Sequence, residues 1–335
     1  MNRKDDHLVY ALKQENKIND FDRVRFVHHS IPSIGIEDVD FGTYIGKHKS
    51  NVPIYINAMT GGSKKAKEIN QLLYQLALSF DIPFALGSFS NGLKDIKLLD
   101  TYMVYNNDDE NRPIIMANIG ADKTLEDAKK TIELLGVDVL QVHINAPQEM
   151  VMPEGERDFT SWSDHIKQMV LELDVDVIVK EVGFGMSKET VEKLKKLGVK
   201  MIDVGGRGGT DFVHIENQRR TYKMDYLENY GLSTVESLLE IKDISNIRVY
   251  ASGGVRHAFD VVKSLALGAE AVGLSRFFLE LVSTKTLEEA KRTTKELLLE
   301  IKEIMVLLNA KSLTDLRHKD LVYDLELMNY LSQRK

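Results

Sequence analysis

The chain has 335 residues, of which 43% are hydrophobic and 28% are charged, and its formal net charge is −7. This composition is typical of an ordinary globular protein. The acidic balance argues against non-specific nucleic-acid binding, although it leaves room for a local basic pocket. The chain contains no cysteine, which excludes disulfides, thiolate nucleophiles and cysteine-ligated metals.

We expect neither a secretion signal nor a membrane span in this chain. Its first residues, MNRKDDHLVY, are charged and lack the apolar segment of a signal peptide. No run of about 18 apolar residues occurs anywhere, so we expect no membrane span. A cytoplasmic enzyme is the expectation that follows.

Short apolar runs alternate with amphipathic stretches of helical period from residue 52 onward. Runs that are apolar almost throughout predict parallel strands buried on both faces. Eight strand–helix units favour a closed (β/α)8 TIM barrel over the alternative, a doubly wound open sheet. The eight predicted strands fall within residues 52–58, 82–88, 113–120, 137–145, 175–183, 199–206, 247–254 and 269–275.

We expect a single domain, because no Pro/Gly-rich linker interrupts the chain. Residues 51–282 would form the barrel and residues 1–50 an N-terminal extension that covers the substrate. Residues 283–335 would form C-terminal helices, from the stretches 286–309 and 312–331. Within the barrel, TLEDAKKTIELLG is a clear helix, since Thr124 can cap its start and Gly136 can end it.

Two glycine-rich turns predict ligand contacts at the carboxyl ends of strands, where TIM barrels carry their active sites. Gly253 and Gly254 precede a helix, and the next strand ends in Ser275 and Arg276. Loops after strands seven and eight form the recurrent phosphate site of these barrels, and glycines allow an anion to approach the backbone. The sequence GGRGGT, which ends in Thr210, is typical of a loop that packs against a flat ligand, although it could be merely flexible.

Lys180 lies in an apolar run, where an unpaired lysine is costly. It could form a salt bridge with Glu181 or Asp203, or it could face a negative ligand group such as a reduced flavin ring. Both interpretations remain open at this point.

The segment QVHINAPQE ends a predicted strand in polar groups. Glu149, with Gln148 and His143, could hold a hard cation through oxygen, since Mg²⁺ often uses only one or two carboxylates together with a substrate phosphate. At the N-terminus, Arg3 and His7 share a helical face beside Lys4, but on this segment alone a solvated, charged helix end is the better explanation.

Taken together, the motifs resemble one family, the type 2 isopentenyl-diphosphate isomerases. The resemblance covers residues 3–335. The glycine motifs also occur in other FMN barrels, but R-K-x-[DE]-H, H-x-N-x-x-Q-E and G-G-R-G-G-T together are much more specific. The matching segments, in chain order, are NRKDDHL, NAMTGG, GS, ANIG, QVHINAPQE, VKEVGFGMS, GGRGGTDF and ASGGVRH.

The resemblance implies a reaction and its cofactors. The enzyme would interconvert isopentenyl diphosphate and dimethylallyl diphosphate by an allylic proton shift, with no net redox change. It would need reduced FMN as the acid/base, NADPH or another reductant, and Mg²⁺. It would act as a homotetramer or higher homo-oligomer, without nucleic-acid or membrane partners.

The resemblance also implies residue roles. Gln148 would lie at the reacting carbons, and His143 is placed with it among the catalytic residues. Glu149 would hold Mg²⁺. The substrate diphosphate would contact Arg3, Lys4, His7, His143 and Asn145. FMN would contact Ala58, Met59, Thr60, Gly61, Ser88, Asn118, Lys180, Thr210, Gly253, Gly254, Ser275 and Arg276.

One position departs from the family pattern, because many members have an arginine shortly after Ser88 and this chain has Asn91. Two other functions compete with the isomerase. A 2-hydroxy-acid oxidase would use an active-site histidine, for which His257 is a poor candidate because we expect it inside a helix. A non-catalytic redox sensor would not need Gln148 and Glu149 beside a flavin.

Overall fold

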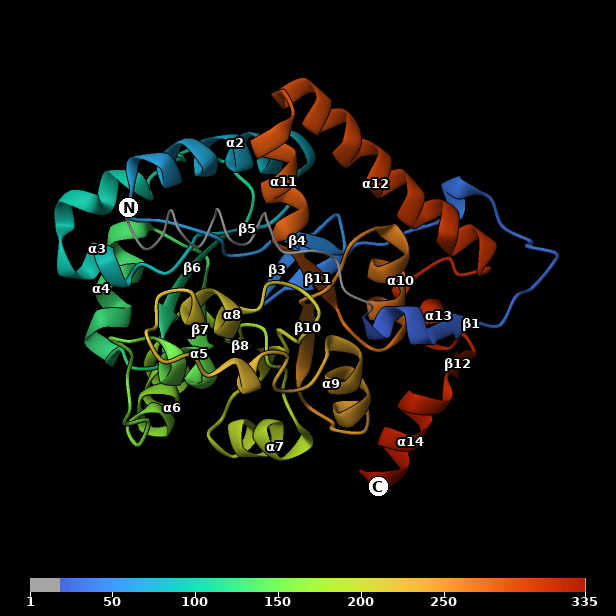
Figure 1. Cartoon of the computed structure of the whole chain (residues 1–335). Coiled ribbons are helices and arrows are strands. Elements are labelled where there is room, and N and C mark those ends of the chain that lie inside the picture. Colours follow the sequence, from blue (N-terminus) through green and yellow to red (C-terminus); the bar gives the residue numbers. More distant parts are fainter. Residues whose placement is uncertain (1–18, 335) are drawn as a thin grey trace.

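The computed structural model of the protein describes residues 19–334. Eight parallel strands form a closed barrel, which confirms the TIM-barrel prediction (Figure 1). Each of the eight predicted runs contains one barrel strand. In chain order these are β4 (Ile54–Ile56), β5 (Phe84–Ala85), β6 (Ile115–Gly120), β7 (Val139–Ile144), β8 (Asp176–Glu181), β9 (Met201–Asp203), β10 (Arg248–Ser252) and β11 (Ala271–Leu274).

The barrel closes where its last strand pairs with its first. β11 runs parallel to β4, with Val272 opposite Ile54 and Leu274 opposite Ile56. An open sheet would leave both of these strands as edges with unpaired backbone groups. Closure therefore brings the carboxyl ends of all eight strands to one rim.

The barrel interior is packed with side chains. Each strand contributes one buried residue to a single cluster, and Ile45 joins it from outside the barrel. The eight strand residues are Tyr55, Ala85, Met116, Val139, Ile178, Met201, Tyr250 and Ala271. This layer is a floor, so a ligand can lie only above it, at the carboxyl-end rim.

A hairpin of β2 (Thr43–Ile45) and β3 (His48–Ser50) covers the opposite end of the barrel. Its turn residue Lys47 donates a backbone hydrogen bond of 2.6 Å to Asp176, the first residue of β8. Arg248, the first residue of β10, donates to the carbonyl oxygen of Gly46 in the same turn. The hairpin thus closes the amino end of the barrel.

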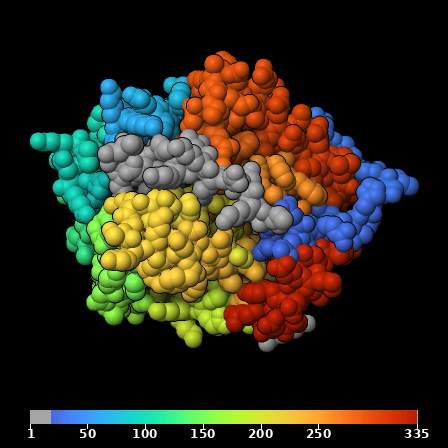
Figure 2. Space-filling model, in the orientation of Figure 1, coloured from blue at the N-terminus to red at the C-terminus, as the bar shows by residue number. Residues whose placement is uncertain are grey.

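Helices surround the barrel, as the amphipathic stretches predicted. In α4 (Leu125–Leu135), Thr124 and Asp127 form a capping box, and Gly136 ends the helix in the left-handed conformation at φ 60°. The helices that follow barrel strands are α2 (Lys64–Phe80), α3 (Ser90–Lys94), α4 (Leu125–Leu135), α5 (Ala146–Val151), α6 (Trp162–Glu172), α7 (Lys188–Lys196), α8 (Phe212–Asn217), α9 (Thr234–Ile241), α10 (Ala258–Ala266) and α11 (Arg276–Thr284). The segment after β9, coloured yellow, forms much of the visible surface in Figure 2.

Short 3₁₀ turns complete the chain between these elements. They are η1 (Asp20–Arg23), η2 (Ile36–Asp38), η3 (Ile96–Thr101) and η4 (Asp225–Leu227). None of the helices in residues 19–334 is both long enough and apolar enough to cross a membrane.

The C-terminal region differs in part from the prediction. The stretch 286–309 forms the long helix α12 (Leu287–Leu307), as expected. The prediction of helix throughout 312–331 is wrong, because α13 (Leu313–Arg317) and α14 (Leu325–Gln333) flank a strand, β12 (Leu321–Tyr323). β12 pairs antiparallel with β1 (Val24–Phe26). Its apolar residues therefore complete a two-stranded sheet with a segment almost 300 residues away, which local periodicity cannot reveal.

Candidate active site at the barrel rim

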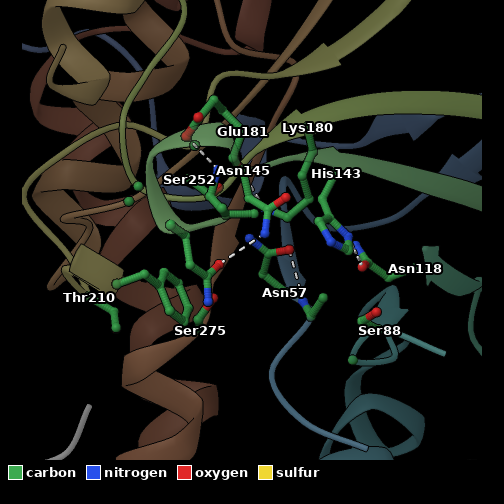
Figure 3. Close-up of a pocket in the computed structure, with 18 of the residues that line it drawn as sticks. Asn57, Ser88, Asn118, His143, Asn145, Lys180, Glu181, Thr210, Ser252 and Ser275 are labelled. Atoms are coloured by element: carbon green, nitrogen blue, oxygen red, sulfur yellow. Dashed lines mark hydrogen bonds between the residues drawn. The ribbon is translucent and has the colours of Figure 1, made fainter. Parts of the chain in front are cut away.

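A cavity of about 440 Å³ lies at the carboxyl ends of the barrel strands. Its size falls in the range typical of small-molecule sites, roughly 300–1,000 Å³. Every barrel strand contributes lining residues from its last positions or from the turn that follows it. The close-up in Figure 3 shows Ser88, His143, Lys180 and Ser275 around the same space, although they come from four different strand–helix units.

One side of the cavity is built from backbone. A Cβ placed on Gly253 would lie 2.0 Å from the carbonyl oxygen of Gly206, and one on Gly209 would lie 2.9 Å from the nitrogen of Gly254. The turns after β9 and β10 therefore touch through glycine backbone, and no larger residue fits there. Asn19 fixes this contact by donating a 2.8 Å hydrogen bond to the carbonyl oxygen of Gly254. The result is a side-chain-free surface of the kind that phosphate groups approach.

The other side of the cavity is built from polar side chains. Nδ1 of His143 lies 2.7 Å from Oδ1 of Asn118, across the β6–β7 pair (Figure 3). The amide of Asn118 in turn donates to Oε1 of Gln141, which is completely buried, at 3.2 Å. Because an amide oxygen only accepts, Nδ1 of His143 must carry the proton in this arrangement. The ring is thus held in one orientation at the cavity wall.

The segment singled out by its polar residues forms a cluster at the start of α5. The Asn145 amide donates to Oε1 of Gln148 at 3.2 Å and to Oε1 of Glu149 at 2.9 Å. The amide nitrogen of Gln148 donates to Oε1 of Glu216 in α8, at 3.2 Å. Both ends of the Gln148 amide are therefore fixed by protein groups, and Gln148 is 7% exposed.

Lys180 has the salt bridge that the sequence left open. Its Nζ lies 3.2 Å from Oδ2 of Asp203 and 3.2 Å from the carbonyl oxygen of Glu181. Asp203 is 0% exposed and Lys180 is 5% exposed, yet Lys180 still lines the cavity. The two interpretations are therefore compatible, because a lysine paired from below can still face a ligand above.

Glu181 is a buried carboxyl with no cation on its side-chain oxygens among the described residues. Its Oε2 accepts backbone hydrogen bonds from Val182 at 2.6 Å and from Phe184 at 2.7 Å. Burial raises the pKa of Glu181 to about 8, even though both N–H groups favour its charged form.

Most of the residues predicted for the site line this one cavity. These are Ala58, Met59, Ser88, Asn118, His143, Asn145, Gln148, Glu149, Lys180, Thr210, Gly253, Gly254, Ser275 and Arg276. Arg3, Lys4 and His7 lie outside the described residues.

Thr60 and Gly61 were predicted for the site but are not among the residues that line the cavity. A Cβ on Gly61 would lie 2.1 Å from the ring of Tyr102, so the turn after β4 packs against that ring at Gly61, whereas its earlier residues Ala58 and Met59 line the cavity. Thr60 is 1% exposed, and within the described chain its hydroxyl oxygen has no hydrogen-bond partner.

The sequence prediction missed other residues of the site. Glu216 is 0% exposed and contacts Gln148, but it lies in a short helix far along the chain and no local pattern marks it. Asn57, Trp162 and Arg256 also line the cavity. Only Asn57, at the end of a predicted strand, carried a signal that could have identified it.

His257 does not line the cavity. It caps the start of α10, where its side chain accepts from the backbone of Asp260, and does not lie inside the helix as expected. This position agrees with the expectation that it is a poor candidate for the base of a hydroxy-acid oxidase.

The raised pKa of Glu181 predicts a pH dependence of stability. The folded-state pKa of about 8 exceeds the ordinary value of 4.5. The folded protein therefore binds the extra proton between these two values, and its stability falls as the pH rises through that window, by at most roughly 1.4 kcal/mol per pH unit. We expect Glu181→Gln to remove this decline, as measured by urea unfolding at several pH values. The exposed Glu172→Gln serves as control, and an unchanged slope in Glu181→Gln would contradict the assignment.

Comparison with known proteins identifies the family. Residues 96–323 match the family described as FMN-dependent dehydrogenase. Similar proteins named isopentenyl-diphosphate delta-isomerase occur in Staphylococcus saprophyticus and Staphylococcus aureus, at 46% and 45% identity. Each alignment covers 99% of this chain and 96% of the relative.

Solved structures support the fold. A flavocytochrome b2 variant with sulfite bound has a TM-score of 0.68 at 21% identity, covering 97% of this chain and 84% of that chain. A mandelate oxidase variant with an FMN adduct has a TM-score of 0.61 at 16% identity, covering 95% and 92%. At such low identity these likenesses concern the barrel alone. The full-length relatives are far more similar, and they show that this chain is an enzyme of the FMN-dependent, type 2 isopentenyl-diphosphate delta-isomerase family.

Proposed function

We propose that this enzyme interconverts isopentenyl diphosphate and dimethylallyl diphosphate with reduced FMN and Mg²⁺ and without net redox change. The observation that carries the proposal is a juxtaposition in one cavity. The glycine surface at Gly206 and Gly253 faces the same space as the cluster of Asn145, Gln148 and Glu149. A site for flavin alone would need only the glycine surface. A site for acid/base chemistry on a metal-bound diphosphate would also need the cluster of Asn145, Gln148 and Glu149.

The residues present fit FMN. Gly253 and Gly254, with Ser275 and Arg276, offer a phosphate group backbone and side-chain donors at the ends of β10 and β11. The cradle excludes side chains, as shown by the 2.0 Å approach of a Gly253 Cβ to Gly206. Ser88, Asn118, Lys180 and Thr210 would hold the ring and ribityl chain.

Bound reduced FMN would supply an acid/base group beside the alkene, together with negative charge that favours a developing carbocation. The protein's own part is orientation. Lys180 presents a cation to the ring site while Asp203 and the carbonyl oxygen of Glu181 hold it from below.

Gln148 is the residue that we place at the reacting carbons. Its Oε1 accepts from Asn145 and its amide nitrogen donates to Glu216, so one amide N–H remains to be directed elsewhere. Arg219 donates to the second oxygen of Glu216 at 2.7 Å, which keeps that carboxylate in place. Because hydrogen bonds at both ends already order this amide, no substrate binding energy is needed to order it before it orients a proton transfer.

Glu149 is the proposed Mg²⁺ ligand. Its two oxygens accept from Asn145 at 2.9 Å and from the backbone of Glu156 at 2.8 Å, which orients the carboxylate. Among residues 19–334 no group of three or more His, Cys, Asp or Glu side chains could hold a metal ion. A magnesium ion here would thus depend on one carboxylate, water and the substrate diphosphate, a common arrangement for this ion.

His143 and Asn145 would contact the substrate diphosphate, and we propose that Lys94 takes the place of the arginine that many family members have after Ser88. Lys94 ends α3 and lines the cavity. Within the described chain its ammonium makes no hydrogen bond or ion pair, whereas Lys123, Arg256 and Arg276 are paired with carboxylates. It is therefore available to an incoming anion.

The family resemblance extends the proposal further. NADPH would keep FMN reduced, the enzyme would be cytoplasmic, and it would form a homotetramer or higher homo-oligomer. The chain would function as a single domain, with residues 1–50 covering the substrate and Arg3, Lys4 and His7 contacting its diphosphate.

The direct test is conversion of isopentenyl diphosphate by the purified protein under anaerobic conditions, with FMN, NADPH and Mg²⁺ each omitted in turn. We expect dimethylallyl diphosphate only when the flavin is reduced and Mg²⁺ is present. Tight FMN binding without any product would retain the flavin site and reject the isomerase.

Removal of the Gln148 amide should separate chemistry from cofactor binding. We expect Gln148→Leu to lower kcat by on the order of 100-fold, the size of a general acid–base contribution, while the Kd of FMN changes little. Steady-state kinetics and flavin fluorescence measure the two effects. The exposed Gln168→Leu on α6 is the control, and a loss of FMN binding equal to the loss of turnover would remove Gln148 from the chemistry.

Lys94→Ala should raise KM for the diphosphate by about three- to tenfold, equivalent to roughly 0.7–1.4 kcal/mol, with a smaller change in kcat. The matched control is Lys97→Ala, which removes an exposed lysine three residues away that does not line the cavity. Equal effects of both substitutions would mean that only the general surface charge matters.

A further inference from the structure

Four donors converge on the buried carboxylate of Asp203. Its Oδ2 accepts from the Tyr55 hydroxyl at 2.6 Å and from Nζ of Lys180 at 3.2 Å. Its Oδ1 accepts from the Ser252 hydroxyl at 2.7 Å and from the backbone of Gly205 at 3.1 Å. Such complete coordination in a 0% exposed position is a built feature and not an accident of packing.

The donors come from separate parts of the barrel. Lys180 is the second-last residue of β8 and Ser252 is the last residue of β10, and these two strands pair with β9, which carries Asp203. Tyr55 reaches Asp203 from β4, which is not a neighbour of β9 in the ring. Asp203 therefore lies inside the barrel just below the rim, and of its side-chain donors Lys180 and Ser252 line the cavity while Tyr55 does not.

The charges in this cluster can be assigned. Burial, with Asp203 beside it, raises the pKa of Tyr55 well above its usual range, so the phenol remains a neutral donor. The cluster then consists of one cation and one anion, Lys180 and Asp203, with no other charged side chain in hydrogen-bonding contact with either among the described residues. The ammonium that faces the cavity thus carries its counter-charge on the side away from the ligand.

We propose that Asp203 is a positioning residue that acts on bound FMN through Lys180, limiting the preference of the site for reduced over oxidised flavin. This inference rests on the proposed FMN site. A lone buried cation beside the ring would favour the anionic reduced form strongly, because opposite charges attract most where water is excluded. The negative charge of Asp203 offsets part of the attraction between Lys180 and the anionic reduced ring. Both redox forms of the cofactor therefore stay bound.

This balance suits the proposed reaction. The cofactor must accept electrons from an external reductant and then act without passing them to the substrate. A site that held only reduced FMN would lose oxidised FMN whenever the cofactor was reoxidised. Asp203 therefore affects how well the cofactor is retained, and it takes no part in the proton shift itself.

The test compares Kd values for oxidised and reduced FMN in the full-length protein, together with the midpoint potential of the bound flavin. We expect Asp203→Asn to favour reduced over oxidised FMN by about tenfold relative to the unchanged protein. For a two-electron couple this is an upward shift of about 30 mV. In a Lys180→Met background, Asp203→Asn should change the ratio of the Kd values for oxidised and reduced FMN by less than about threefold.

Several outcomes would overturn the inference. An unchanged ratio in Asp203→Asn would mean that the carboxylate only supports the fold. A lower midpoint potential in Asp203→Asn would mean that the charge of Lys180 no longer reaches the ring. An equal rise of the potential with and without Lys180→Met would mean that Asp203 does not act through Lys180.

Tyr55→Phe provides a second test if Asp203→Asn does not fold. It keeps both charges and removes the phenol that shares Oδ2 with Lys180. More of the carboxylate charge then faces the ammonium. We therefore expect the midpoint potential of the bound flavin to fall, with a change of less than about threefold in the preference for reduced over oxidised FMN. An upward shift would contradict the proposal. Failure of the unchanged protein to bind FMN would instead reject the proposed cofactor site, so the two failures are distinguishable.

Discussion

The closure of the barrel between β11 and β4 is the constraint on which the site depends. The pairing of Val272 with Ile54 leaves no free edge, and it places all eight carboxyl ends around one opening. The buried layer below, with one residue from each strand, stops a ligand from entering the barrel. A small molecule can bind only at the rim, where every strand contributes its last residues and where side chains are free to differ without disturbing the core.

The rim divides into two halves with different chemistry. At the carboxyl ends of the neighbouring strands β9, β10 and β11, the residues that line the cavity are mainly glycine and serine, so this half presents mainly backbone. The neighbouring strands β6, β7 and β8 carry Asn118, His143 and Lys180 near their carboxyl ends, so that half presents side chains. The ion pair of Lys180 with Asp203 joins the two halves at the β8–β9 boundary. Under the proposed function, a flat cofactor with a phosphate tail and a second, metal-bound anion would therefore share one opening without competing for the same donors.

Much of this arrangement was predictable from the sequence, because it depends on local patterns. Buried parallel strands are apolar almost throughout, so all eight could be located, and the fold then assigned their polar ends to one rim. What the sequence could not show are contacts that depend on side-chain direction or on distant segments. Thr60 follows a strand end as Ser88 does, yet it lies buried, because its neighbour Gly61 packs on the Tyr102 ring. Glu216 reaches Gln148 from α8, and nothing in its own helix signals that contact.

The charge balance around Gln148 explains why two nearby carboxylates can have different roles. Glu216 is fully buried and is neutralised by Arg219, which also contacts Glu154 at 2.6 Å. The carboxylate of Glu149 accepts from the Asn145 amide and from the backbone N–H of Glu156, and within residues 19–334 no cation pairs with it. A carboxylate that is already paired with an arginine attracts a further cation only weakly, because the net charge of the pair is zero. Under the proposed function, a divalent ion that enters with a diphosphate would therefore be attracted to Glu149 and not to Glu216. In the proposed reaction, the neutral amide of Gln148, which contacts Asn145 and Glu216, would face the hydrocarbon part of the substrate without adding charge of its own.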